Sequence, residues 1–392
     1  MSDTKSSDQN TLKLGITMLT NDNNFGLGVY VIFMLWVGLS LAEVSFVISI
    51  WLLMHSIGQI PSGIFADRYG YKNSLIIGSV IFFGGTLLFA TGQSFIWLLI
   101  GYALNGFGSA MKQGADYALL YEHLKEQGKD KLYKKLAGRL DFYTNIFWFV
   151  SGISGGLLYM YNARFPFYAE AGVAAIGIIA CLLLIEPHRS KNNFSITKQI
   201  RESIETSFKT PHFSKIFIFS ALIGSVAMVT LQYVQPLYQS LGIPEVYFGF
   251  IAAGFFIFRG LGSWFADKLG KLFSVDKYLI LHAAVFGLFL VLIQRVGSIY
   301  LIFPILAVFY FLRGLYAPTI STFINDRVTS AQRATMLSIN KQFLTVIAAV
   351  SVSGLAVIAE NFGLQQVFFA ISIMSIVFLI SYVLSVRRVA ID

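Results

Sequence analysis

The chain has 392 residues, of which 56% are hydrophobic and 12% are charged, and its mean hydropathy is +0.69. Soluble domains carry about 25% charged residues, so this composition excludes the water-soluble classes and predicts an integral membrane protein. The apolar residues come in runs of roughly 20 without the alternation of membrane β-strands, which predicts an all-α protein and excludes a β-barrel.

Metal and cofactor chemistry is not indicated by the residue types present. Cys181 is the single cysteine and lies inside an apolar run, so we expect no disulfide and no cysteine-based metal site. The five histidines show no ligand spacing, and no phosphate-binding loop or nucleophile elbow occurs. We therefore expect no cofactor, no metal and no catalytic residue, and hence not an enzyme. The polar start, Met1 to Lys13, leads into a long apolar run, and we expect no cleavable signal.

Apolar runs between polar breaks predict twelve membrane-spanning helices. They cover residues 12–37, 41–66, 74–92, 95–120, 139–160, 166–185, 213–238, 246–266, 278–295, 298–324, 336–359 and 364–386.

The distribution of basic residues tests this count, because orientation follows Lys and Arg in the loops. Of the 29 basic residues, 24 fall in the two termini, in every second loop, or within the span ends that adjoin them. The alternate loops hold Arg164 and Arg295, and Lys112, Arg259 and Arg313 fall within spans. With an odd number of spans the basic residues would lie on both sides of the membrane, so the number is even. We therefore expect a multi-pass cell-membrane protein with both termini in the cytoplasm. The net charge of +9 then reflects the asymmetry, and no nucleic-acid partner is expected.

A long polar stretch, Glu186 to Lys215, separates six spans from six and carries six basic residues. We predict an N-terminal six-helix bundle over 1–185, a cytoplasmic linker over 186–212 and a C-terminal six-helix bundle over 213–392. Within the linker, apolar residues recur every fourth position from Ile196 to Phe208, which predicts a short helix on the membrane surface.

An internal repeat supports duplication of a six-span unit. The run Phe65 to Gly70 recurs as Phe265 to Gly270, offset by 200 residues, and each copy ends the second span of its half. Two like halves around a central path predict a substrate site near the midplane and alternating access by rocking of the halves.

The run from Gly63 to Lys72 resembles the loop motif G-x-x-x-D-R-x-G-R-K of the major facilitator superfamily, with Tyr71 in place of the second Arg. The resemblance implies twelve helices in two six-helix bundles and a secondary active transporter. We expect Gly63 to allow close helix approach, Asp67 to accept N–H bonds from a facing helix N-terminus, and Arg68 to supply a charged partner. The expected cytoplasmic gate comprises Gly63, Asp67, Arg68, Gly70 and Lys72 with the second copy, Asp267, Lys268 and Gly270. Alternatively, these turns only set orientation.

Within that superfamily, the run Gly114 to Tyr121 and the pair Glu186-Pro187 resemble bacterial drug:proton antiporters. Two departures concern coupling: Tyr102 stands where antiporters commonly have Arg, and the run 151–156 lacks the proline of G-P-x-x-G-G. The resemblance implies proton-coupled efflux of a small amphipathic compound, by a monomer in the lipid bilayer. The alternatives are a proton-coupled importer of a sugar, peptide or organic acid, and a lipid flippase.

Ionisable residues at membrane depth are functional candidates because burying a charge there is unfavourable. In the N-terminal half, Asp22 is the acid that our spans place well away from both surfaces, and we predict that it carries the coupling proton. Alternatively, the helix starts at Phe25 and the polar run around Asp22 caps it. His55 lies mid-span and either senses pH or makes an interior hydrogen bond.

Further candidates lie in spans four, seven, eight and ten. Lys112 and Asp116 are four residues apart, so on one helix they share a face and pair, or Asp116 meets Arg68 or Arg139. Arg259 and Arg313 either bind an anionic or carbonyl group, serve as counter-ion to Asp22, or pack against backbone carbonyls. Possible substrate or gate contacts in span seven are Gln232, Tyr233 and Gln235, next to Pro236, which we expect to break or bend the helix.

Overall fold

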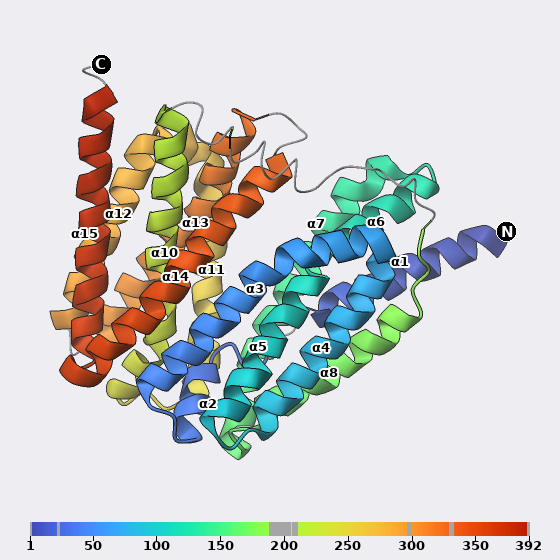
Figure 1. Cartoon of the computed structure of the whole chain (residues 1–392), viewed down its shortest axis with the longest axis horizontal. Coiled ribbons are helices and arrows are strands. Elements are labelled where there is room, and N and C mark those ends of the chain that lie inside the picture. Colours follow the sequence, from blue (N-terminus) through green and yellow to red (C-terminus); the bar gives the residue numbers. More distant parts are fainter. Residues whose placement is uncertain are drawn as a thin grey trace. The chain divides into compact units, whose positions relative to one another are not determined.

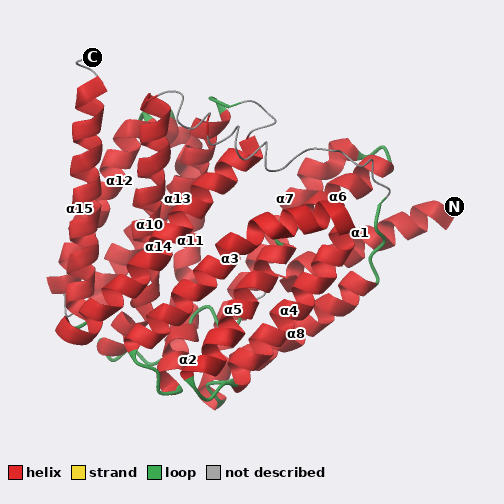
Figure 2. Ribbon diagram, viewed as in Figure 1, coloured by secondary structure: helices red, strands yellow, loops and turns green. Residues whose placement is uncertain are grey.

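The computed structural model describes residues 2–21, 24–187, 205, 211–295, 299–328 and 333–389. These residues form α-helices joined by short turns, and no strand occurs among them (Figure 2). The predicted all-α fold is therefore confirmed. The helices are α1 (Ser2–Asn21), α2 (Tyr30–Trp36), α3 (Leu41–Tyr69), α4 (Tyr71–Thr91), α5 (Phe95–Lys112), α6 (Ala115–Glu126), α7 (Tyr133–Tyr161), α8 (Phe165–Leu182), α10 (Pro211–Ser240), α11 (Val246–Gly270), α12 (Val275–Arg295), α13 (Ile299–Asn325), α14 (Arg333–Phe362) and α15 (Leu364–Val389).

Nine helices within the described ranges are long and apolar enough to cross a membrane. They are α3, α4, α8 and the six helices from α10 to α15. The other three predicted spans correspond to α1 with α2, to α5 with α6, and to α7. Those three stretches carry breaks or polar ends, which explains why a continuous apolar window does not capture them.

Two predicted spans are not single helices. The span expected over 12–37 ends as α1 at Asn21 and resumes as α2 at Tyr30, with turns over residues 25–29. The span expected over 95–120 stops at Lys112, and α6 begins at Ala115 after Gly114, whose φ is +88°. A residue with positive φ interrupts helical hydrogen bonding, and glycine adopts this conformation without steric penalty.

Two compact units make up the chain, residues 1–193 with 244–253, and residues 194–243 with 254–392. We call them unit 1 and unit 2. The first residues of α11, together with the two residues before it, thus belong to unit 1. The predicted linker over 186–212 and its surface helix over 196–208 lie mostly outside the described residues, and they remain predictions.

In unit 1, α3, α4, α5 and α8 run side by side (Figure 1). Glycines allow α4 and α5 to touch through their backbones. A Cβ added to Gly101 would lie 2.6 Å from the backbone nitrogen of Phe89, and one added to Gly85 would lie 2.5 Å from that of Asn105. Close backbone approach at small residues is a main way in which membrane helices associate.

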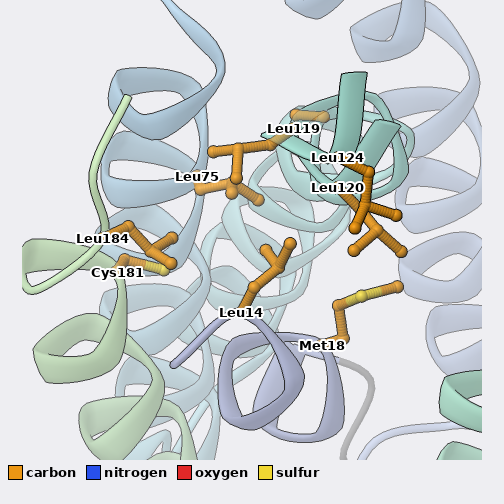
Figure 3. Close-up of a cluster of buried hydrophobic side chains, with 9 residues drawn as sticks. Leu14, Met18, Leu75, Leu119, Leu120, Leu124, Cys181 and Leu184 are labelled. Carbon is orange, nitrogen blue, oxygen red and sulfur yellow. The ribbon is translucent and has the colours of Figure 1, made fainter. Parts of the chain in front are cut away.

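A cluster of buried hydrophobic side chains holds several helices of unit 1 together at one end of the unit (Figure 3). Its members come from α1, α4, α6 and α8 and the residues that follow α8: Leu14, Met18, Leu75, Ala115, Leu119, Leu120, Leu124, Cys181 and Leu184. Next to it, the Asn10 side chain accepts a hydrogen bond from the backbone N–H of Ile185 at 2.9 Å. The amphipathic helix α6 is thereby held against the ends of α1 and α8.

Unit 2 is held together by a buried polar network as well as by apolar packing. Asn340 of α14 donates to the carbonyl of Phe217 and to the hydroxyl of Ser220, both at 2.9 Å. The Tyr316 hydroxyl of α13 donates to the carbonyl of Ser220 at 2.7 Å. These bonds tie α10, α13 and α14 together in an apolar setting where unpaired polar groups are unfavourable.

Candidate functional site

The break in the first span lies against α8. Its turns are closed by short backbone bonds, including Val29 N–H to the carbonyl of Gly26 at 2.8 Å. The backbone N–H of Gly26 donates to the Glu170 carboxylate of α8 at 3.2 Å, and Glu170 is 8% exposed. A charged group of α8 therefore satisfies a backbone donor that the break leaves without a helical partner.

Aromatic rings surround this contact. The rings of Phe33, Phe89 and Phe167 lie within 4.5–5.2 Å of one another, centroid to centroid. A Cβ on Gly26 would lie 2.5 Å from the Phe167 ring, so only glycine allows the break to sit this close to α8. Tyr102 of α5, the position where antiporters commonly have Arg, stacks on Phe89 with 4.8 Å between centroids.

His55 lies in a second polar cluster of unit 1. Its ring stacks on Trp51 at 5.1 Å with an interplanar angle of 9°. The Trp51 indole N–H donates to Asn105 at 2.8 Å, and Asn105 donates to the Thr86 hydroxyl at 2.8 Å. These bonds connect α3, α4 and α5. His55 is therefore an interior, half-buried residue, and its role as a pH sensor remains a prediction.

Arg259 and Arg313 lie on two neighbouring helices of unit 2. They lie near the middle of α11 and α13, and both are half-buried. Both guanidinium groups act electrostatically on the hydroxyl of Tyr310, which is buried and stacks on Phe255 with 4.8 Å between centroids. The backbones of α11 and α13 touch at Gly262 and Gly314, which holds the two arginines on neighbouring helices.

The internal repeat relates this arginine pair to a contact in unit 1. Arg259 and Arg313 lie 200 residues after Gln59 and Gln113, which is the offset of the repeat. In unit 1 the Gln59 amide donates to the Gln113 amide oxygen at 2.9 Å. The same pair of positions is therefore neutral in one unit and doubly positive in the other.

The polar residues of the seventh span have mixed surroundings. Tyr233 is buried and donates to the carbonyl of Val352 at 2.7 Å, which is a packing role within unit 2. Gln235 is buried, whereas Gln232 is half-buried and makes a long bond of 3.4 Å to the carbonyl of Met228. The expected break at Pro236 is not observed, because α10 continues through the proline to Ser240.

The first gate motif spans the junction of α3 and α4. Asp67 and Arg68 are exposed at the end of α3, and Gly70 has φ +110° and ψ 149°, a conformation that requires glycine. The Glu186 carboxylate accepts the N–H groups of Tyr71 and Lys72 at 2.9 and 2.7 Å. Glu186 thus caps α4, and this use of the Glu-Pro pair was not predicted.

One expectation for that motif is wrong. Gly63 was expected to allow a neighbouring helix to approach closely, but no atom lies within 4 Å of a Cβ added there. Gly63 is exposed on α3, so its small size has no packing consequence in this structure.

The second copy of the motif lies at the end of α11. Asp267 accepts a bond from Lys271 at 2.7 Å, one turn further along, and Lys268 and Gly270 are exposed. A cavity of about 570 Å³ adjoins this end of α11 and is lined also by residues of α12 and α13. Asp267 is thus engaged by its own helix.

The pairing argument for Lys112 and Asp116 rested on one continuous helix and is wrong in that respect, because the break at Gly114 separates them. Lys112 is 3% exposed, and its Nζ lies 3.5 Å from the centroid of the Phe82 ring. Asp116, which is 6% exposed, accepts the N–H of Tyr117 in the first turn of α6. Asp22 lies outside the described residues.

Glu170 is the main residue that our sequence reasoning missed. It is buried in α8, so Asp22 is not the only candidate acid of the N-terminal half. A sequence signal existed, because Glu170 is the one charged residue between Phe165 and Leu182. The shared electrostatic effect of Arg259 and Arg313 on Tyr310 was also missed, although both positions follow from the repeat offset.

The sequence profile of the Major Facilitator Superfamily matches residues 14–275. The uncharacterized MFS-type transporter YxaM of Bacillus subtilis is 23% identical over 347 residues, which cover 83% of this chain and 82% of that protein. The probable vesicular acetylcholine transporter-A of Danio rerio is 30% identical over 131 residues, only 33% of this chain and 25% of that protein.

Solved structures of transporters have a similar fold. The nucleoside transporter NupG superposes with a TM-score of 0.81 at 17% identity, covering 96% of this chain and 99% of that chain. A D-xylose-proton symporter superposes with a TM-score of 0.72 at 13% identity, covering 96% of each chain. At these identities the likeness concerns the fold.

Proposed function

Because this chain belongs to the Major Facilitator Superfamily and is therefore a multi-pass membrane protein of a secondary-transporter family, we propose that it exports a small amphipathic compound in exchange for protons. The compound carries an anionic or carbonyl group. The transporter acts as a monomer in the cell membrane, with both termini in the cytoplasm.

The observation that carries the substrate class is the arginine pair of unit 2. Two guanidinium groups near mid-helix act electrostatically on one tyrosine hydroxyl, and among the described residues no carboxylate forms an ion pair with Arg259. A positive charge at membrane depth is unfavourable, and a bound anion relieves that penalty at Arg259. Guanidinium groups bind carboxylate and phosphate oxygens in a bidentate manner.

The apolar part of the substrate is supported by the aromatic rings beside the arginines. Phe255 stacks on Tyr310, and its centroid lies 6.0 Å from that of Phe303. The Arg259 guanidinium lies 5.7 Å from the centroid of the Phe256 ring. Such rings favour a flat or apolar group next to the anionic one. Gln232, the half-buried polar residue of α10, remains a candidate contact from the same unit.

Proton coupling is supported by the ionisable residues that the sequence predicts at membrane depth in the N-terminal half. Asp22 remains the proton carrier that the sequence predicts, with His55 and Asp116 as the next residues to test. The alternatives are proton-coupled import and lipid flipping. Proton-coupled import is supported by the similar fold of a D-xylose-proton symporter.

The test uses the full-length protein in liposomes with a pH-sensitive dye in the lumen. Aromatic carboxylates and phosphates are offered together with matched neutral and cationic analogues. If the proposal is right, anionic compounds accumulate in vesicles whose lumen is more acidic than the medium, and the lumen loses protons. Accumulation only when the medium is the more acidic side would establish import. If no compound moves with protons, proton coupling is wrong.

A further inference from the structure

Glu170 is a buried acid that none of the roles above uses. It lies in the second turn of α8, is 8% exposed, and is the only charged residue of that helix. Within the described part of the chain it forms no ion pair, and its hydrogen bond comes from the backbone N–H of Gly26 at 3.2 Å. A carboxyl group held at membrane depth by a neutral donor is able to exist in either protonation state.

The partner of Glu170 is a break in a membrane helix. Irregular backbone at this depth is tolerated where protein covers it or where it lines a path for the solute. Phe167, one turn before Glu170 on α8, packs flush against Gly26. A change at the Glu170 carboxyl therefore acts on the one place where the described first span lacks a continuous helix.

Other titratable groups around Glu170 are few. Lys112 and Tyr102, both on α5, interact electrostatically with it, and the ring of Tyr30 on α2 lies 6.3 Å from that of Tyr102. Lys112 is engaged with the Phe82 ring.

The helices packed on α8 add little charge near Glu170. Residues 14–21 of α1 and 73–91 of α4 contain no titratable side chain, and the outer half of α7 contains Tyr159 and Tyr161. Arg164, just before α8, donates to the carbonyl of Ala90. Glu170 is thus the acidic group of this region among the described residues.

We propose that Glu170 binds and releases the coupling proton, and that its protonation weakens the hold of α8 on the break in the first span. An ionised carboxylate accepts a charge-assisted bond about twice as strong as a neutral bond. Once protonated, Glu170 holds the Gly26 N–H less firmly and itself gains a donor. Proton binding is thereby converted into a backbone change. This inference rests on the proposed proton coupling and names the group that performs it.

Glu170→Gln separates the two roles of this side chain, because the amide keeps the acceptor for Gly26 and loses the titration. Glu43→Gln is the matched control: Glu43 also accepts a backbone N–H, from Ser40 at 2.8 Å, but at the start of α3. Infrared spectra of the full chain in lipid vesicles are recorded across pH. The protonated carboxyl band that titrates should persist in Glu43→Gln and disappear in Glu170→Gln.

The backbone response is read by hydrogen exchange at a single alkaline pH. Amides of residues 24–29 should exchange several-fold faster in Glu170→Gln than in the wild type, because glutamine mimics the neutral acid. Glu170→Asp should keep a titrating band at a shifted frequency, which tests the assignment if the glutamine variant folds poorly. A band that persists in Glu170→Gln, or exchange that does not change there, overturns the inference.

These measurements need no substrate, so they are independent of the liposome assay. Wild-type vesicles in which no compound moves with protons would refute the proposed coupling, whatever the infrared result. If Glu170→Gln still couples transport to protons, the inference about Glu170 is wrong and Asp22 becomes the leading candidate for the proton carrier.

Discussion

Arg259 and Arg313 are the residues whose meaning changes most between the sequence and the structure. Each alone is an arginine within an apolar run, for which packing against backbone carbonyls is a sufficient explanation. In the structure both act electrostatically on Tyr310, and they occupy the repeat positions of the neutral pair Gln59 and Gln113. Two positive charges near the same tyrosine, rather than either charge alone, favour the binding of an anion.

Arg259→Gln should therefore weaken the binding of anionic substrates roughly tenfold, which corresponds to about 1.4 kcal/mol of binding free energy. The binding of a neutral analogue should change little. The substitution removes a bidentate cation but keeps a polar side chain, as in the repeat position Gln59. The KM measured in liposomes tests this. Arg327→Gln is the control, because Arg327 is exposed and lies over the Phe323 ring. Equal loss for the anionic and neutral compounds would mean that Arg259 is a packing residue.

The two copies of the gate motif should differ in importance. Asp67→Asn should reduce transport by about tenfold with expression near that of the wild type, because the predicted gate loses its acidic charge. Asp267→Asn should have a smaller effect, since its turn matches the motif less well and Asp267 already pairs with Lys271 on its own helix. Uptake rates normalised to surface protein measure both. Equal and mild effects would reduce the two turns to signals of orientation.

Asp22, the proton carrier predicted from the sequence alone, is the alternative to Glu170 and makes a separate prediction. Asp22→Asn keeps the shape and removes the titration, so the variant should exchange substrate down its gradient without acceleration by a pH difference. Counterflow and pH-driven uptake in the same vesicles test this. Proton movement at the wild-type ratio would place coupling elsewhere.

At the scale of elements, glycine decides where helices stop and how closely they pack. Gly114 has a positive φ and ends α5, and Gly26 lets the break in the first span sit against Phe167. Hydropathy alone predicted continuous spans at both places, because a short break changes the average over about 20 residues very little. The backbone conformation at a single glycine is therefore visible only in the structure.

Gly101→Ala tests the backbone contact between α4 and α5. The added Cβ would lie 2.6 Å from the Phe89 nitrogen and 3.0 Å from the Gly85 carbonyl, and neither backbone atom is free to move. Overpacking of this kind costs about 1–3 kcal/mol, so the thermal midpoint in detergent should fall by several degrees.

Gly84→Ala is the matched control for this contact. Gly84 lies on α4, is exposed, and has no atom within 4 Å of an added Cβ. The better helix propensity of alanine should leave stability unchanged or raise it by up to about 1 kcal/mol. If both alanine variants behave alike, the close packing of α4 on α5 does not limit stability.

At the scale of the whole molecule, topology follows from charge. The segregation of 24 basic residues, in the termini, in every second loop and at the adjoining span ends, against two in the alternate loops is the argument for an even number of spans. The fold likeness to other transporters supports the same twelve-helix arrangement. Orientation in the membrane is nevertheless a prediction, because it depends on the bilayer and the insertion machinery.

Reporter fusions test the orientation directly. A fusion after Lys191 and one after Asp392 should both be active in the cytoplasm, because each follows a basic segment. A periplasmic-type reporter, active only outside the cytoplasm, serves as the reciprocal measurement. External activity at either position would contradict the topology.

The sequence by itself determined the class, the number and order of most spans, and the duplication, since these depend on hydropathy averaged over many residues and on charge counts. It also pointed to Arg259 and Arg313 as unusual residues. Only the tertiary structure put these arginines on neighbouring helices where both act electrostatically on Tyr310, set Glu170 against the Gly26 N–H and used Glu186 to cap α4. Those arrangements involve residues 54, 144 and 115 positions apart in the chain. Local patterns report on near neighbours, whereas packing between helices decides which distant groups meet.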